Sequence, residues 1–346
     1  MLEILKSKHN PTEKLVPNLM DKKNYVIHYR NLKLYLQLGM KLKKINRVIS
    51  FSQSPWLKKY IDFNTDKRKE AKSDFEKDMF KLMNNAVFGK TMENVRKRMR
   101  YDLVTDKKRF QKLVNDVTFK GHDHISENLV GVSRSKNRVV LDKPIIVGFS
   151  ILELSKVLMY DFHYNVMKKK YGDKIKLLFT DTDSLCYEIE TEDFYKDVKE
   201  ISHHFDFSEY PKTHELYSEE FKKALGKFKD ETHSILIREF VGLRSKMYSF
   251  KYFDDKKGKL VESKKLKGIK KSVVKKEITF NDYYRSLMGE TKENIQQMAK
   301  FNCIRSIKHQ LYSITVDKVG ICAHDDKRFL LDNINTLAFG HYKIKN

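Results

Sequence analysis

The sequence predicts an α+β protein, because helical and strand patterns occupy different stretches of the chain. From Ser73 to about Arg98, apolar residues recur at three- and four-residue intervals, the period of an amphipathic helix. Residues 175–189 instead place aromatic and β-branched residues on both sides of Asp181-Thr182-Asp183, a pattern typical of a β-hairpin. Residues 235–253 have the composition of two further strands.

The first half of the chain is expected to begin with helices. Residues 24–48 predict a helix flanked by short extended pieces. The helix of residues 73–98 carries one apolar stripe, and we expect this stripe to be its buried face. The stripe consists of Phe75, Met79, Leu82, Met83 and Ala86. Gly89 in the same helix predicts close approach of another backbone, because glycine costs about 1 kcal/mol there relative to alanine.

The middle and the end of the chain predict further elements in order. Residues 101–147 indicate strands and turns, ending in the β-branched run that follows Pro144. Ser150 and Glu153 have the spacing of a capping box, so a helix should follow and end at Gly172. Beyond about Lys256 the chain is rich in lysine, and we expect a mostly helical lobe.

The net charge indicates a polyanionic partner. The 346 residues include 70 Lys and Arg against 46 Asp and Glu, a formal charge of +24. Residues 58–100 carry 13 basic and 7 acidic side chains, and residues 251–280 carry 11 and 4, net charges of +6 and +7. Residues 181–230 carry 7 and 14, a net charge of −7. This distribution suggests phosphate contacts on either side of a cation site, although a lysine-rich composition can also reflect an AT-rich genome.

Several classes of protein are not favoured by the sequence. No apolar run approaches the roughly 18–20 residues that span a bilayer, and the first residues lack the apolar region of a signal peptide. Cys186, Cys303 and Cys322 lie far apart, without spacing suited to disulfides or zinc. We therefore expect an intracellular protein in a reducing compartment, with no membrane partner and no structural metal.

Asp181 and Asp183, at the tip of the predicted hairpin, are candidate metal ligands. Carboxylate oxygens bind Mg²⁺, and two metal ions about 3.5–4 Å apart can activate a hydroxyl and stabilise a leaving group. Aspartate is also common in turns because its side chain accepts local hydrogen bonds, so the pair alone leaves both interpretations open.

Lys81, Asn85 and Phe88 share one face of the helix of residues 73–98, opposite the apolar stripe. An ammonium suits a triphosphate, and a flat ring suits a sugar and a base. A solvated face with an isolated phenylalanine is the alternative.

Arg244, Lys246 and Tyr248 alternate within a predicted strand, which would place all three on one side of a sheet. Two cations and a phenol in a row can follow a phosphate backbone, although an exposed sheet face would have the same pattern.

Taken together and in this order, the three motifs resemble those of family B DNA polymerases. Lys81-x3-Asn85-Ala86-x-Phe88-Gly89 is similar to the fingers motif K-x3-N-S-x-Y-G of that family. Phe179 to Ser184 resembles the palm motif Y-x-D-T-D-S, and Lys246-Met247-Tyr248 resembles the K-x-Y motif. The resemblance extends over about residues 25–287. Within the family, the sequence is most similar to protein-primed polymerases of Polinton-like mobile elements and related viruses.

The resemblance implies a right-hand architecture and a role for each motif residue. It implies fingers at 63–100, an antiparallel palm sheet within 101–255 and a mostly helical thumb at 256–346, after a preceding segment at 1–62. Template-dependent transfer of dNTPs to a primer end would need two Mg²⁺ ions. The expected partners are primer–template DNA, dNTPs and a terminal priming protein. The implied roles are metal binding and catalysis for Asp181 and Asp183, nucleotide binding for Lys81, Asn85, Phe88 and the weaker candidate Lys69, and DNA binding for Arg244, Lys246 and Tyr248.

The sequence also departs from the family pattern. Ala86, Phe88 and Phe179 stand where the motifs have hydroxyl-bearing residues, which suggests altered tuning. The other palm aspartate, followed by S-L-Y-P, and the exonuclease domain do not occur in these 346 residues, so we expect the C-terminal part of a polymerase, incomplete for catalysis. The alternative is a non-catalytic DNA-binding remnant of a polymerase. A reverse transcriptase or a metal nuclease fits the helix motif and the D-T-D pattern less well.

Overall fold

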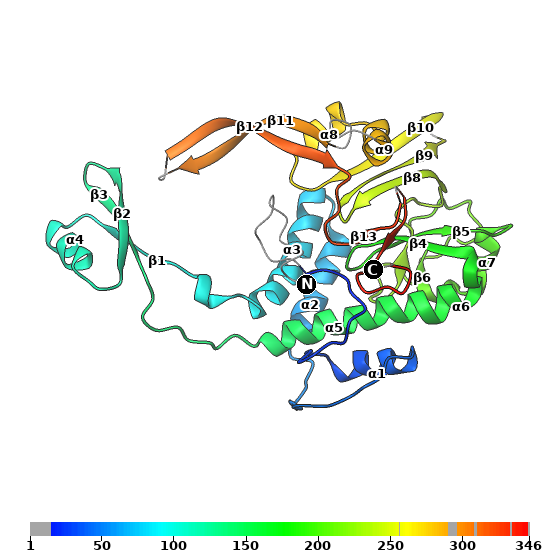
Figure 1. Ribbon diagram of the computed structural model, residues 1–346, viewed down its shortest axis with the longest axis horizontal. Coiled ribbons are helices and arrows are strands. Elements are labelled where there is room, and N and C mark those ends of the chain that lie inside the picture. Colours follow the sequence, from blue (N-terminus) through cyan, green and yellow to red (C-terminus); the bar gives the residue numbers. More distant parts are fainter. Residues whose placement is uncertain (1–14, 256, 290–295, 308–309, 333, 345–346) are drawn as a thin grey trace. The chain divides into compact units, whose positions relative to one another are not determined.

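The chain divides into two compact units in the computed structural model (Figure 1). The structure describes residues 15–255, 257–289, 296–307, 310–332 and 334–344. Unit 1 consists of Met1–Val26, Leu158–Phe301 and Val316–Asn346, and unit 2 of Ile27–Val157 and Asn302–Thr315.

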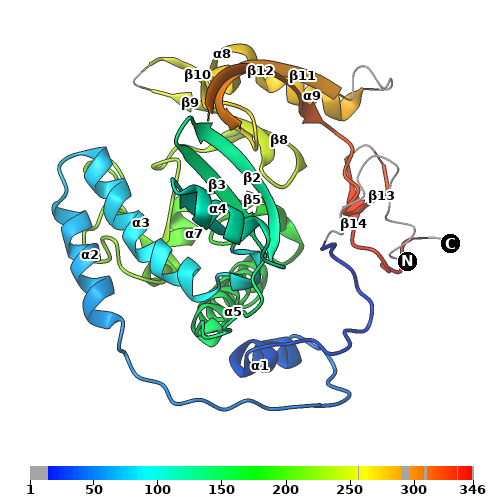
Figure 2. The same cartoon turned by 90° about the vertical axis from the view of Figure 1, so that its left-hand side faces the viewer.

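Unit 2 contains a helical part and a small sheet. Its helices are α1 (Tyr29–Gln37), α2 (Lys58–Glu70), α3 (Asp74–Thr91) and α4 (Lys107–Val114), with a 3₁₀ turn at Val95–Lys97. The strands β1 (Arg100–Val104), β2 (Phe119–Ser126) and β3 (Leu129–Arg134) pair antiparallel in the order β1-β3-β2. Figure 2 shows α2 and α3 side by side, and α4 packs on the small sheet.

Unit 1 is built around a three-stranded antiparallel sheet in the order β10-β9-β8. Its strands are β8 (Ile237–Arg244), β9 (Met247–Asp254) and β10 (Lys259–Leu266), with α8 (Lys271–Glu277) and α9 (Phe280–Met288) packed beside them (Figure 1). The buried core of this part includes Val241, Leu243, Met247, Tyr283 and Ile321. Mixed α and β structure with antiparallel sheets confirms the predicted α+β class.

The helix ending at Gly172 is confirmed, but its start differs from the prediction. Helix α5 (Ile145–Asp161) begins in the β-branched run and continues through a π-helical turn, Phe162–Met167, into α6 (Lys168–Tyr171). Gly172 ends it with φ +58°, a backbone conformation that glycine adopts readily. Ser150 therefore lies inside the helix, and the capping-box prediction is wrong.

The predicted hairpin is confirmed. Strands β4 (Ile175–Thr180) and β5 (Leu185–Ile189) pair antiparallel and leave residues 181–184 as the connection. One side of the hairpin packs on a core that includes Phe162, Tyr171 and Ile175. This region also contains the helix α7 (Phe194–Glu200) and 3₁₀ turns at Gly172–Lys174 and Ser202–His204. A short parallel pair completes it, formed by β6 (Phe205–Asp206) and β7 (Phe228–Lys229).

The expectation of a mostly helical segment after residue 256 is wrong. Apart from α8 and α9, the regular elements of the described residues there are strands. They are β10, the long pair β11 (Gln296–Ile307) and β12 (Gln310–Cys322), and the short pair β13 (Phe329–Leu330) and β14 (Thr336–Leu337). Lysine tolerates both structures, so a lysine-rich composition was a poor guide to secondary structure here. The expectation of strands and turns at residues 101–147 is confirmed by β1, β2 and β3, but it is wrong for the helix α4 and for the β-branched run, where α5 begins.

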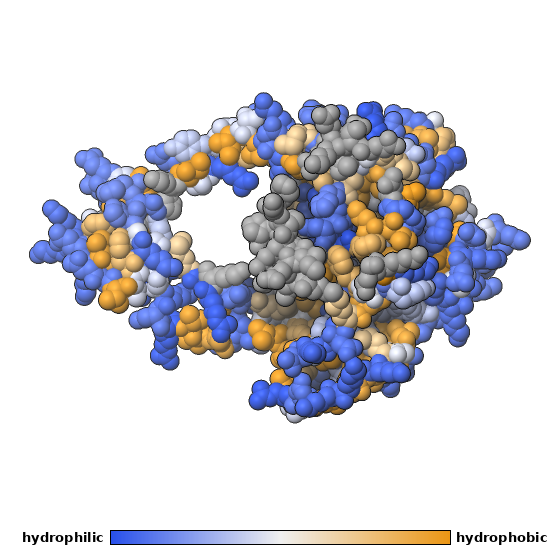
Figure 3. Space-filling view, in the orientation of Figure 1, coloured by the Kyte–Doolittle hydropathy of each residue, from blue (hydrophilic) through white to orange (hydrophobic). Residues whose placement is uncertain are grey.

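Among the described residues, no helix combines the length and the apolar character that crossing a bilayer requires. Many large apolar side chains are nevertheless exposed, including Leu82, Ile304 and Leu311. Figure 3 shows hydrophobic groups interspersed among hydrophilic ones on the face it presents.

Candidate metal and nucleic-acid site

The tip of the β4–β5 hairpin holds two aspartates on one tight turn. The backbone N–H of Asp181 donates to the carbonyl of Ser184 (3.1 Å), and that of Asp183 donates to the carbonyl of Asp181 (2.7 Å). Thr182 between them has φ +61°, a left-handed conformation that costs about 1 kcal/mol or more for a residue with a β-carbon. Asp181 is half-buried and Asp183 is exposed, so both carboxylates are accessible to solvent.

Lys246 approaches this turn from a distant part of the sequence. Its Nζ lies 3.2 Å from Oδ1 of Asp181, and both side chains belong to unit 1. Lys246 lies in the turn between β8 and β9, has φ +60°, and accepts a hydrogen bond at its carbonyl from the N–H of Lys267 (3.1 Å). The structure therefore brings together two of the three sequence motifs.

A second contact between the same motifs is aromatic. The ring of Phe179 in β4 stacks on that of Tyr248 in β9, with centroids 4.4 Å apart and an interplanar angle of 23°. Phe240 in β8 also stacks on Phe179, with ring centroids 5.9 Å apart. Gly242 leaves room for it, because a β-carbon there would lie 2.9 Å from the Phe240 ring. The sequence motifs did not identify Phe240, although its aromatic type within a predicted strand was a signal.

The environment of Tyr248 is apolar and negatively charged. Burial, together with the charges of Glu231 and Asp181, raises the pKa of its phenol to about 12. Burial also raises the pKa of the neighbouring Cys186 thiol to about 11. Tyr248 is therefore a neutral hydroxyl at pH 7, able to donate or accept a hydrogen bond.

The prediction that Arg244, Lys246 and Tyr248 lie on one side of one strand is wrong. Strand β8 ends at Arg244 and β9 begins at Met247, so the chain reverses between them. Arg244 pairs with Met247, and Gly242 with Tyr248. A tight turn can contain residues with strand-like composition, and period-two alternation stops there.

The donor chemistry at the hairpin tip suits a divalent cation. Mg²⁺ is commonly held by one or two carboxylates together with substrate phosphates and water, and this turn supplies two carboxylates. Asp181 already faces one cationic group, the Lys246 ammonium. Across the part of the chain that the structure describes, no group of three or more His, Cys, Asp or Glu side chains could hold a metal ion. Asp181 and Asp183 thus fit a site that relies on further oxygen ligands.

The predicted nucleotide-binding residues lie in unit 2. Lys81 and Asn85 are exposed on α3, and Phe88, one turn further, is half-buried. A capping box at Ser73 and Glu76 starts this helix, since each side chain accepts from the other residue's backbone N–H. Lys69 lies in the last turn of the preceding helix α2, where its Nζ pairs with Oδ1 of Asp66 at 3.0 Å on the surface. An exposed pair of this kind contributes at most about 1 kcal/mol.

The expected burial of the apolar stripe on α3 is wrong. Phe75 is 77% exposed and Leu82 is 66% exposed. The face that meets α2 contains Asn84, whose Nδ2 donates to Oγ1 of Thr65 at 3.4 Å. The spacing correctly indicated which residues share a face, but it could not indicate which face another helix covers. A β-carbon on Gly89 would meet nothing within 4 Å among the described residues, so the close backbone approach predicted there is not found in this part of the chain.

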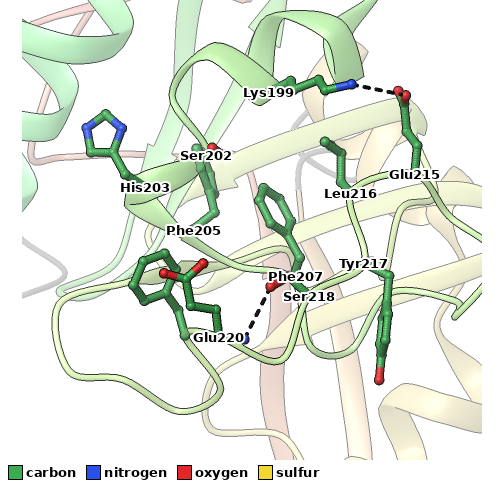
Figure 4. A pocket seen from close by; sticks show the side chains of 11 residues that line it. Lys199, Ser202, His203, Phe205, Phe207, Glu215, Leu216, Tyr217, Ser218 and Glu220 are labelled. Atoms are coloured by element: carbon green, nitrogen blue, oxygen red, sulfur yellow. Dashed lines mark hydrogen bonds and ion pairs between the residues drawn. The ribbon is translucent and has the colours of Figure 1, made fainter.

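A separate cavity of about 350 Å³ lies in the acidic part of unit 1 (Figure 4). Phe205, Phe207 and Leu216 give it an apolar lining, and Lys199 pairs with Glu215 at its rim (3.7 Å). None of the nine predicted site residues lines this cavity.

Comparison with protein-family models, with curated proteins and with solved structures gave no match.

Proposed function

We propose that this chain carries the metal-binding and primer-end part of a DNA-directed DNA polymerase of family B. The observation that carries the proposal is the double contact between the D-T-D hairpin and the K-M-Y turn. Lys246 pairs with Asp181, and Tyr248 stacks on Phe179. The two motifs lie about 60 residues apart in the sequence, and in that family both act in the same reaction. An accidental resemblance would give no reason for them to be in contact in the fold.

Each residue has a distinct part in the proposed site. Asp181 and Asp183 hold Mg²⁺, which when bound supplies charge neutralisation for nucleotidyl transfer to a primer 3′-hydroxyl. Lys246 and Tyr248 hold the end of the primer strand, through a charge on the phosphate and a hydroxyl at the sugar edge. Lys81 and Asn85 bind the triphosphate of the incoming dNTP, Phe88 contacts its sugar and base, and Lys69 and Arg244 supply further phosphate contacts. The right-hand architecture and a terminal priming protein as partner belong to the same proposal.

The second candidate is a DNA-binding protein without catalysis. Two observations favour this candidate. The Lys246 ammonium already pairs with Asp181, and the hairpin tip offers only two carboxylates to a metal ion. In this case the basic surfaces bind DNA, while the aspartates act only as turn residues and as a partner for lysine.

Binding experiments separate the two candidates. A fluorescent primer–template duplex is titrated with the protein, and Mn²⁺ is titrated separately as a probe of the magnesium site. If the polymerase proposal is correct, Asp183→Ala weakens Mn²⁺ binding and leaves the fold intact, and Tyr248→Ala weakens binding of the duplex more than of single-stranded DNA. DNA binding with no Mn²⁺ binding that depends on Asp183 would instead favour the second candidate.

A further inference from the structure

Lys246 places a positive charge at the hairpin tip. Among the described residues, it is the basic side chain that forms an ion pair with Asp181, at 3.2 Å from Oδ1. A divalent cation on the same carboxylate would have to displace this ammonium or share the oxygen with it. Because both groups are positive and would lie within a few ångströms of each other, each opposes the binding of the other.

The backbone fixes the base of the Lys246 side chain and leaves its ammonium partly exposed. The next residue, Met247, is buried in the sheet core, and the carbonyl of Lys246 is fixed by the N–H of Lys267. The side chain itself is 49% exposed, and the partner Asp181 side chain is 30% exposed. An exposed pair of this kind is weak, so a stronger anion at the same turn can draw the ammonium away. A phosphodiester of a primer strand is such an anion.

We propose that Lys246 is an internal counter-cation that couples DNA binding to metal binding at Asp181. Without DNA, the ammonium neutralises Asp181 and lowers the affinity of the hairpin tip for divalent cations. When DNA binds, a primer phosphate pairs with the Lys246 ammonium in place of Asp181. The Asp181 carboxylate is then available, and the hairpin tip binds the divalent cation more tightly. By reciprocity, a bound cation releases Lys246 to the phosphate and strengthens DNA binding by the same factor. This inference rests on the proposed function, and it adds an order of loading, with DNA first and metal second.

The test measures Mn²⁺ binding directly, through the electron paramagnetic resonance signal of the free ion. Wild type and Lys246→Ala are compared with and without primer–template duplex, and a titration of the duplex alone gives the correction for Mn²⁺ bound to DNA. Removing one exposed ion pair should lower the Mn²⁺ Kd of the free protein about five-fold, which corresponds to about 1 kcal/mol. The duplex should lower the wild-type Kd by a similar factor and leave that of Lys246→Ala unchanged.

Two matched variants serve as controls. Lys246→Arg keeps the positive charge and should retain the coupling. Lys251→Ala removes a lysine of the same sheet that pairs with Glu239 instead (3.2 Å), and should leave the Mn²⁺ Kd at the wild-type value.

The outcomes separate the inference from the proposed function. An Mn²⁺ Kd that is unchanged or higher in Lys246→Ala, with binding still lost in Asp183→Ala, overturns the counter-cation role alone. Equal Mn²⁺ binding by wild type and Asp183→Ala overturns the metal site of the proposed function, and the inference with it. Thermal melting of each variant shows that the comparison is made between folded proteins.

Discussion

The buried carboxylate of Glu153 should make a large contribution to the stability of unit 2. Its side chain is nearly inaccessible, and its Oε2 accepts from the backbone N–H of His28 (3.2 Å) and from Nδ2 of Asn31 (2.9 Å). Its Oε1 pairs with Nζ of Lys156 at 2.7 Å. Glu153 thus ties α5 to the first turn of α1.

Replacing Glu153 by alanine leaves two buried donors without their acceptor. Asn31 is only 1% exposed, and its Oδ1 already has no hydrogen-bond partner within the described chain. An unsatisfied buried donor costs about 1–3 kcal/mol, so we expect the variant to lose about 3 kcal/mol of unfolding free energy. Glu153→Gln keeps one acceptor oxygen and should lose about 1–2 kcal/mol. Lys156→Ala removes only the partly exposed partner and should cost less than about 1 kcal/mol.

Urea unfolding at pH 7, followed by far-UV circular dichroism, measures these differences. Amide hydrogen exchange on α1 shows whether the loss is local, because the N-terminal amides of this helix should exchange faster in Glu153→Ala than in Lys156→Ala. An unfolding free energy of Glu153→Ala within about 0.5 kcal/mol of wild type would refute the reasoning, since that is the range of ordinary surface substitutions.

The pH dependence of the same variants gives an independent check. Burial acts to raise the pKa of Glu153, but the hydrogen bonds from Lys156, Asn31 and His28 outweigh it, so the pKa lies below its usual value of 4.5. A carboxyl whose pKa is lowered by folding stabilises the protein above its unfolded pKa, and this stabilisation is lost as the pH falls through the folded pKa. The difference between wild type and Glu153→Gln should therefore be constant from pH 6 upward, within about 0.5 kcal/mol, and shrink below about pH 4.5.

Three further predictions concern binding and activity. Affinity for a primer–template duplex should fall at least about 100-fold between about 50 and 200 mM salt and should depend little on the DNA sequence. The reason is that residues 58–100 and 251–280 carry most of the excess positive charge, which would bind phosphates. A nearly flat salt titration would contradict this. Lys81→Ala should weaken dNTP binding about ten-fold and DNA binding much less, whereas the control Lys90→Ala, on the same helix, should leave dNTP binding unchanged. Equal losses for both ligands in Lys81→Ala would indicate a general charge effect. The 346-residue chain should extend no primer detectably in Mg²⁺. Two-metal transfer needs carboxylates that converge on both ions, whereas both carboxylates of this site come from one turn. Incorporation of dNTPs that is lost in Asp183→Ala would instead show that another acidic residue completes the site.

Local signals in the sequence were sufficient for several elements of this protein. The Asp181-Thr182-Asp183 hairpin, the helix that ends at Gly172 and the start of the helix capped by Ser73 all follow from patterns within a few residues. The end of that last helix was predicted less well, since α3 ends at Thr91 and not near Arg98. Turn formation and helix termination by glycine are decided mainly by neighbouring residues and their own backbone groups. For that reason the sequence predicted both carboxylates of the candidate site on one turn.

Other features were decided only by the tertiary structure. Glu153 has the spacing of a capping residue, yet its partners His28 and Asn31 come from a helix more than 120 residues away. The stripe on α3 looks like a buried face, yet Asn84 lies on the face that meets α2. The contact of Lys246 with Asp181 depends on where the β8–β9 chain reversal lies relative to the hairpin. Periodicity and spacing describe a segment by itself, whereas burial and contacts between distant residues depend on the segments that pack against it.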